Sequence, residues 1–239
     1  MKKVEVLLPL LLAGALAVHA QQPAPTAAGL KKSFAELAAS TETDGEAFGQ
    51  LVSKTPRQLV TYLKAHDLTA AQARQMGLGY ATAPDGVLQV YTYSYQSGGT
   101  RGTVHRSVLG WHNAAGQRFA YATEEEGDFG KVHRLVNAGR TQYLLLGGDA
   151  GDSNCYSYEA WVVELKGNYL RLDQTAFGKE SSFHICNVPM TFVAATQALR
   201  LDLTEFSAKY DNTLLPEWGR PTGKAMTLYF RNGRFGKSK

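Results

Sequence analysis

The sequence predicts a mainly β fold, an antiparallel β-sandwich or barrel-like sheet preceded by a short helical N-terminal segment. From Asp85 to the end, stretches of strand length recur at a spacing of roughly 8–12 residues, separated by glycine and asparagine turn signals, as in such folds. Before Asp85 the chain is rich in alanine, and its apolar residues recur at three- and four-residue intervals, the spacing of helices. Helices followed by strands make the class α+β by order and mainly β by weight.

Residues 1–20 have the pattern of a signal peptide. Two lysines precede a mostly apolar run, and Val18-His19-Ala20 is a small-x-small cleavage site. Residues 21–28 (QQPAPTAA) are too polar and proline-rich to pack and are expected to be a linker. We therefore expect an exported protein, periplasmic or secreted, and no later stretch is apolar for the length of a membrane-spanning helix.

Residues 29–78 are expected to form a helical segment that packs on the sheet. An apolar stripe begins with Leu30, Phe34 and Leu37. A second short helix is expected from Glu46. Thr55-Pro56 is typical of an N-cap followed by a first-turn proline, which predicts a separate helix there. Thr69 and Gln72 have the spacing of a capping box and predict one more short helix.

Residues 79–239 are expected to form the antiparallel β domain, beginning with a hairpin over 85–111. The two faces of its first strand both carry apolar side chains, which predicts a sheet covered on both sides. Residues 147–154 are expected to be a long polar loop, and Asn232-Gly233 is the strongest hairpin signal of the chain. Further strands are expected at 117–123, 132–137, 142–146, 156–165, 168–174, 182–186, 198–203, 208–211 and 224–230.

The hairpin also carries a short motif. The pattern D-G-x-L-x-x-Y-[ST], a gap and G-G-T is formed here by Asp85, Gly86, Leu88, Tyr91, Thr92, Gly98, Gly99 and Thr100. It resembles a pattern of uncharacterised exported β-rich proteins of Gram-negative bacteria. Those proteins tend to have Trp and Asp after the Tyr-Ser, where this chain has Tyr93 and Ser94. The resemblance implies export and a β-rich fold, and it implies no activity.

Cys155 and Cys186 are the two cysteines of the chain. In an oxidising compartment an even count predicts a disulfide. His184 shares a strand face with Cys186, so a thiol site is the alternative, and the disulfide is favoured. A bond between them is expected to stabilise the fold by roughly 3–4 kcal/mol.

The predicted loop suggests a candidate calcium site. Asp149, Asp152 and Asn154 place three oxygen-bearing side chains in a glycine-rich stretch, and calcium prefers such ligands. Their spacing departs from the EF-hand pattern, so local turns are the favoured interpretation. No metal or other cofactor is therefore expected.

Tyr91, Tyr93, Tyr95 and Trp111 are a candidate aromatic platform for a sugar or peptide. Such rings are equally expected to pack across neighbouring strands, and we favour that interpretation.

No catalytic motif stands out. His105, His112 and His133 are scattered and form no H-E-x-x-H, and no G-x-S-x-G turn is present. Glycosidase carboxylates come from strands distant in sequence, and the candidates on predicted strands are Glu159, Glu164 and Asp202.

Charge and motifs together favour a binding protein. The formal charge of +4, which falls by one on removal of residues 1–20, is too mild for a nucleic-acid binder. We expect a non-catalytic binding or structural module of the cell envelope, with another envelope protein or a glycan as partner. The alternative is a glycan- or peptidoglycan-directed hydrolase whose carboxylates the sequence does not identify.

Overall fold

A computed structural model describes residues 24–97, 102–152, 154–206 and 223–237, apart from the side chain of Asp152. The predicted fold class is confirmed, since short N-terminal helices are followed by antiparallel sheets. The predicted signal peptide over 1–20 and the strand expected at 208–211 lie outside the described residues.

The helical segment precedes the first strand. It consists of α1 (Ala27–Ala39), the 3₁₀ turn η1 (Glu42–Asp44), α2 (Glu46–Leu63) and α3 (Ala70–Gln75). The expected capping box is present, because Thr69 Oγ1 accepts from the backbone N–H of Gln72 and the Gln72 side chain accepts from the N–H of Thr69. The separate helix predicted to begin at Thr55 is wrong, since α2 runs through Pro56 without interruption. Phe48, Leu59 and Leu63 are buried on either side of that proline. Their packing stabilises the helix by more than the loss of the one backbone hydrogen bond that proline cannot donate.

The strands form three sheets, each with antiparallel neighbours. Sheet 1 contains β1 (Gly79–Thr82), β2 (Leu88–Gln96), β3 (Thr103–His112) and β4 (Arg118–Glu126). Sheet 2 contains β5 (Asp128–Leu135), β6 (Thr141–Asp152), β7 (Cys155–Lys166), β8 (Tyr169–Leu172) and β9 (Ser182–Cys186), with β8 and β9 both pairing with β7. Sheet 3 contains β10 (Met190–Val193), β11 (Ala198–Asp202), β12 (Ala225–Arg231) and β13 (Arg234–Lys237), with η2 (Ala194–Thr196) between β10 and β11.

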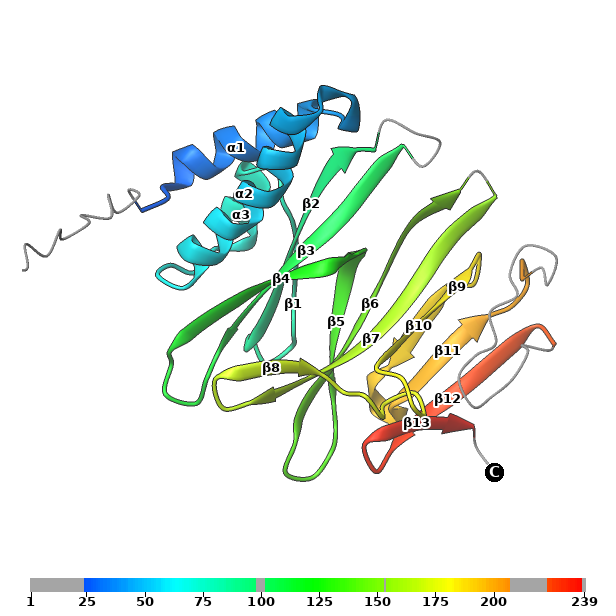
Figure 1. Cartoon of the computed structure of the whole chain (residues 1–239). Helices are drawn as coiled ribbons and strands as arrows, with labels where there is room; N and C mark the ends of the chain where they lie inside the picture. Colours follow the sequence, from blue (N-terminus) through cyan, green and yellow to red (C-terminus); the bar gives the residue numbers. More distant parts are fainter. Residues whose placement is uncertain (1–23, 98–101, 153, 207–222, 238–239) are drawn as a thin grey trace, which may run out of the picture.

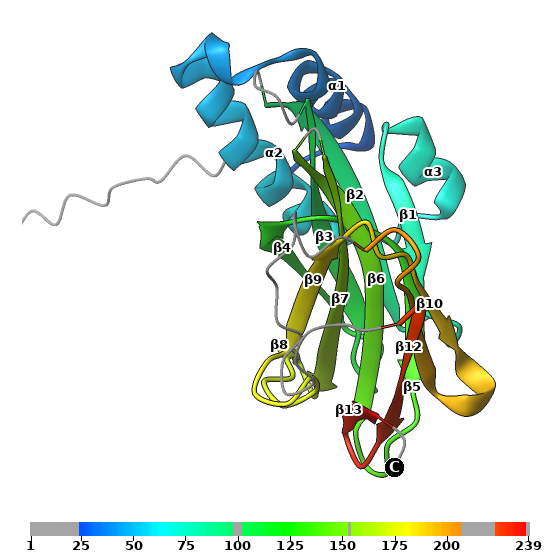
Figure 2. The same ribbon diagram turned by 90° about the vertical axis from the view of Figure 1, so that its right-hand side faces the viewer.

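The helices and the three sheets lie in successive layers, which Figure 1 shows from the blue helices to the orange and red strands of sheet 3. Figure 2 shows α3 beside β1, separate from α1 and α2. A separate hydrophobic core fills each of the three interfaces between layers. Sheets 1 and 2 each lie between two other layers, which explains why strands such as β2 are apolar on both faces.

Strand β2 illustrates this two-sided burial. Tyr91, Tyr93 and Tyr95 face the helices, whereas Leu88 and Val90 lie in the core shared with sheet 2. All five side chains are at most 4% exposed. The prediction of a sheet covered on both sides is confirmed.

The predicted polar loop over 147–154 is wrong, because residues up to 152 continue strand β6. Gly147 pairs with Glu159 and Asp149 pairs with Ser157 across the β6–β7 hairpin. A Cβ at Gly147 would lie 2.1 Å from the backbone oxygen of Asp128, so only glycine lets β5 approach here. The glycines that suggested a loop are therefore explained by close strand packing.

The turn at Asn232-Gly233 joins β12 to β13 and confirms the predicted hairpin. Asn232 and Gly233 have φ values of 52° and 85°, the left-handed pair that a type I′ turn needs. The turn places Arg231 and Arg234 directly opposite one another.

The predicted disulfide is also confirmed. Cys155 at the start of β7 is bonded to Cys186 at the end of β9, with Cα atoms 5.0 Å apart. The bond therefore fixes one end of the β7–β9 pair.

A buried ion network lies at the opposite end of sheet 2. Arg140 binds Glu164 through Nε (3.0 Å) and Nη2 (2.8 Å), and Nη2 also lies 2.6 Å from Asp173 Oδ2. Arg171 contacts the same Glu164 from the exposed side. The arginine contacts lower the pKa of Glu164 to about 2. The network ties the β5–β6 turn to β7 and to the segment after β8.

Candidate functional site: an acid-lined cavity

A cavity of about 200 Å³ opens where the end of β4 meets β7, β8 and β9. Its walls come from sheets 1 and 2, which makes it a junction between layers. The lining residues are Glu125, Glu126, Glu159, Trp161, Leu172, Ser182, Phe183 and His184. We refer to it as the acidic cavity, because three of the lining side chains are carboxylic acids and, among the described lining residues, none is Lys or Arg.

Glu159 is the central acid of this cavity. It shares one face of β7 with Trp161 and Val163, which belong to the core between sheets 1 and 2. The β4–β5 corner closes over it, since a Cβ at Gly127 would lie 3.1 Å from Glu159 Oε2. The carboxyl group is therefore held at the edge of an apolar core.

This environment keeps Glu159 protonated well above the usual pH range of a carboxylic acid. Burial, and next the negative charge of Asp149, raise the pKa of Glu159 from 4.5 to about 7. The carboxylates of Glu125 and Glu126 act in the same direction, and a hydrogen bond with the Trp161 side chain opposes them. Glu159 thus changes charge near neutral pH.

Asp149 is held in the opposite state. Its carboxylate accepts from the backbone N–H of His105 (2.8 Å), from His105 Nδ1 (3.0 Å) and from the N–H of Ala150 (2.7 Å). These bonds outweigh burial and lower the pKa of Asp149, while the carboxylate raises the pKa of His105. The pair joins β3 of sheet 1 to β6 of sheet 2 beside the acidic cavity. It holds a fixed negative charge next to Glu159.

A substitution of Glu159 by glutamine is expected to stabilise the protein at high pH. Because the pKa is raised in the folded state, the carboxyl's contribution to stability is complete below 4.5 and is lost as the pH rises through about 7. After allowance for partial exposure, the loss is roughly 2–3 kcal/mol. Urea unfolding should therefore give the variant and the wild type equal stability at pH 4.5 and a more stable variant at pH 8.

Glu124→Gln is the matched control for that measurement, since Glu124 is an exposed residue of β4 that does not line the cavity. It should leave the pH dependence unchanged. A pH profile that Glu159→Gln does not alter would contradict the assigned environment.

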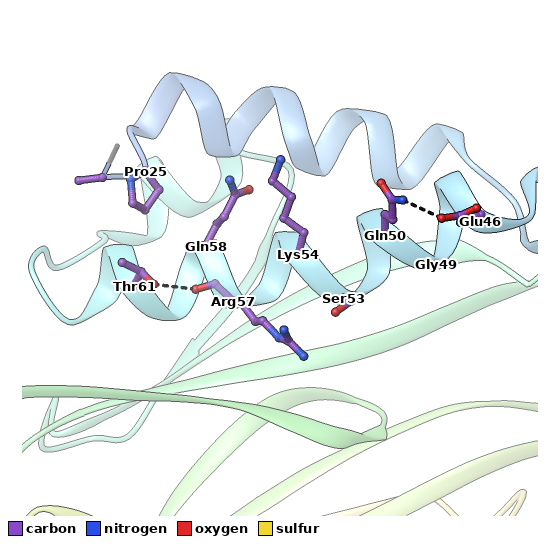
Figure 3. A pocket seen from close by; sticks show the side chains of 10 residues that line it. Pro25, Glu46, Gly49, Gln50, Ser53, Lys54, Arg57, Gln58 and Thr61 are labelled. Carbon is purple, nitrogen blue, oxygen red and sulfur yellow. Dashed lines mark hydrogen bonds between the residues drawn. The ribbon is translucent and has the colours of Figure 1, made fainter. Parts of the chain in front are cut away.

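A larger groove, of about 740 Å³, runs along the polar side of α2. Figure 3 shows its side chains, which include Lys54, Arg57 and Gln58. Apart from Ala24 and Pro25, all its described lining residues come from the single helix α2. Because the described residues bring no second polar wall to face α2, the groove does not converge on a ligand, and we place the site at the acidic cavity.

The three residues of the candidate calcium site lie at the β6–β7 hairpin. The Asp149 carboxylate is engaged by His105, and the exposed Asn154 accepts from the Asn187 side chain through its backbone oxygen. The side chain of Asp152 is outside the described part. Within the described residues, no group of three or more His, Cys, Asp or Glu side chains is arranged to hold a metal ion.

The four rings of the candidate aromatic platform are buried. Tyr93 and Tyr95 pack on Phe34 of α1 and Phe48 of α2, and Tyr91 packs on Tyr80. Trp111 lies on the other face of sheet 1, stacked on Phe119. The rings therefore serve two different cores and share no surface that a ligand can reach.

The remaining candidate residues are distributed over the fold. His112 Nε2 contacts Asp67, which also binds Arg118, and these contacts tie the segment after α2 to sheet 1. Burial lowers the pKa of His133, whose ring lies 5.1 Å from that of Phe192. Glu164 belongs to the Arg140 network, and Asp202 accepts hydrogen bonds from Thr204.

Sequence reasoning identified Glu159 as one acid among three, but not its neighbours. Glu125 and Glu126 lie on β4 and His184 lies on β9, and only the tertiary fold brings these strands to Glu159 on β7. The available signal was a single acid on the β7 face that also carries Trp161 and Val163.

No family model, curated protein or solved structure matches this chain. Among the described residues, no helix combines the length and the apolar character needed to cross a membrane.

Proposed function

We propose that the protein is an exported, non-catalytic binding module of the cell envelope, and that its acidic cavity binds a cationic group such as a primary amine or a guanidinium. The observation that carries this proposal is the convergence of Glu125, Glu126 and Glu159 on one cavity. Glu126 already has a cation 3.8 Å away in Arg106, so a cation that enters chiefly relieves the repulsion between Glu125 and the ionised Glu159. The indole ring of Trp161 and the side chain of Leu172, which lie on the same side of sheet 2 as Glu159, provide apolar walls for the carbon skeleton next to the charge.

The cavity is small for an extended ligand. Its volume of about 200 Å³ lies below the roughly 300–1,000 Å³ typical of sites that enclose a whole small molecule. This size favours recognition of one terminal group of a larger molecule. A side chain or a sugar substituent that carries an amine is of suitable size.

A hydrolase is the second candidate, because Glu159 with a pKa of about 7 is suited to act as a general acid beside the ionised Asp149. Asp149 and Glu159 are diagonal neighbours on β6 and β7, a relation that places Cα atoms roughly 7–8 Å apart. However, the Asp149 side chain is only 4% exposed, and its oxygens already accept three hydrogen bonds. A base that activates water needs a free oxygen, so this arrangement favours the binding module.

Calorimetric titration with 1,4-diaminobutane tests the proposal, with 1,4-butanediol as the uncharged analogue. Because Glu159 ionises near pH 7, the diamine is expected to bind about tenfold more tightly at pH 8 than at pH 6. Glu159→Gln should weaken binding at pH 8 to the level seen at pH 6, and Glu124→Gln should behave as the wild type.

Equal binding of the diamine and the diol, or no loss of affinity in Glu159→Gln, would rule out cation recognition in this cavity. Release of reducing sugar from peptidoglycan by the wild type, abolished in Glu159→Gln, would favour the hydrolase instead.

A further inference from the structure

The outward face of sheet 3 carries arginines that form no ion pair with any residue that the structure describes. Burial alternates along β11, β12 and β13, so that Leu199, Leu201 and Leu228 lie in the core with sheet 2. The opposite, outward side chains include Thr191, Arg200, Thr227, Tyr229, Arg231 and Arg234. We call this surface the arginine face.

Arg231 and Arg234 face each other across the Asn232-Gly233 turn. Directly opposed residues of an antiparallel pair have Cβ atoms about 4.5–5.5 Å apart, and like charges in that position destabilise a hairpin. Both side chains are exposed, and within the described part of the chain neither forms an ion pair. The Arg231 guanidinium lies over the Tyr229 ring, 5.4 Å from its centre.

The arginines of the other two sheets are different. Each of the following forms an ion pair with an aspartate or glutamate: Arg106, Arg118, Arg134, Arg140 and Arg171. Since those pairs neutralise the arginines of sheets 1 and 2 and of the β5–β6 turn, neighbouring arginines of sheet 3 that form no ion pair with a described residue indicate a surface that receives its anions from a ligand.

A third arginine sets the length of that ligand. Arg200 pairs with Thr227 on β12, four residues before Arg231. At about 3.4 Å per residue, Arg200 and Arg231 are separated by roughly 14 Å along the direction of β12, too far for one carboxylate or phosphate to bridge. Asp202, an acid on the same face, is already engaged by the hydroxyl and the N–H of Thr204. The ligand must therefore be extended and carry negative groups at intervals.

The residues between the charged positions are neutral. Thr227 and Tyr229 lie there and offer a hydroxyl group and a partly exposed phenol ring. A nucleic acid would bring a phosphate to this stretch for every nucleotide, and no arginine is present among its described residues to meet it. Along β12 the face presents Arg200, then the neutral Thr227 and Tyr229, then the Arg231–Arg234 pair. A polysaccharide in which acidic and neutral sugars alternate matches this order. Guanidinium groups bind sugar carboxylates in bidentate fashion.

We propose that the arginine face binds an acidic polysaccharide in which charged and neutral sugars alternate, laid along β12. This site is separate from the acidic cavity and does not depend on the function proposed there. The polysaccharide follows the direction of β12, with its carboxylates on Arg200 of β11 and on the Arg231–Arg234 pair.

The test is affinity electrophoresis and calorimetry of the full chain with hyaluronate, an alternating glucuronate and N-acetylglucosamine polymer. The double variant Arg231→Gln/Arg234→Gln is expected to bind at least about tenfold more weakly, because it loses two charge-assisted contacts. The matched control is Arg57→Gln/Arg74→Gln, which removes the same charge from exposed positions of α2 and α3 and should bind as the wild type. The Arg231/Arg234 variant should melt at or above the wild-type temperature, because it loses the repulsion between the two arginines, and the control should melt close to the wild type or slightly below it. These melting temperatures separate lost binding from lost folding.

Neutral dextran and single-stranded DNA complete the experiment. Binding of hyaluronate but not of dextran, lost in the Arg231/Arg234 variant alone, supports the proposal. The proposal is overturned by absent binding, by equal losses in both double variants, or by DNA that binds as tightly as hyaluronate at equal charge.

Discussion

Replacement of Arg140 by alanine is expected to lower the free energy of unfolding by about 3–5 kcal/mol. The substitution leaves Glu164 and Asp173, whose side chains are 7% and 4% exposed, without the cation that neutralises both. A buried carboxylate that loses its partner is destabilised by much more than the attraction of an exposed ion pair. Urea unfolding at pH 7 measures the effect.

Arg171→Ala is the matched control, since Arg171 contacts the same Glu164 but is 58% exposed. Its removal should cost below about 1 kcal/mol, in line with surface ion pairs. Equal losses of unfolding free energy in the two variants would contradict the claim that Arg140 neutralises the two buried carboxylates. The low pKa of Glu164 adds a second readout. The stabilisation that the ionised Glu164 carboxylate provides is complete above pH 4.5 and is lost as the pH falls through about 2.

Removal of the disulfide has the second large expected effect. The variant Cys155→Ser/Cys186→Ser should lose roughly 3–4 kcal/mol, because a free chain of this loop length has more conformations to lose on folding. Strand β9 pairs with β7 alone among the named strands, so without the bond its end is the first part expected to detach. Thermal melting followed by circular dichroism measures the loss.

A reductant provides the control for the disulfide. It should lower the melting temperature of the wild type to that of the double variant and leave the variant unchanged. A wild type whose melting is insensitive to reductant while its thiols become reactive would contradict a stabilising role.

The fold class follows from local pattern. Hairpins such as β12–β13 depend on a turn of two residues, and period-two alternation marks most strands. The division of the strands into three sheets cannot be predicted from local sequence. Leu88 and Tyr91 of β2 both have apolar character, and no local pattern indicates which layer each side chain contacts. Pro56 and Gly147 mislead for a related reason. Locally, proline signals a helix start and clustered glycines signal a loop, but tertiary packing keeps Pro56 inside α2 and Gly147 inside β6.

The acidic cavity shows a similar limit. Glu159 stands out only faintly in the sequence, as one acid on an apolar strand face. The pKa of Glu159 is raised first by burial and next by the negative charge of Asp149 on β6, with a further contribution from Glu125 on β4 of another sheet. Such coupling is a property of the stacked layers, and no spacing in the sequence encodes it.

The most direct test of the central claim is an NMR titration of the Glu159 carboxyl carbon, with and without 1,4-diaminobutane. We expect a midpoint near pH 7 for the free protein and a lower midpoint with the diamine, because a bound cation favours the ionised carboxylate. A midpoint near 4.5 that the diamine does not move would contradict both the buried, acid-lined environment and the cation-binding function built on it.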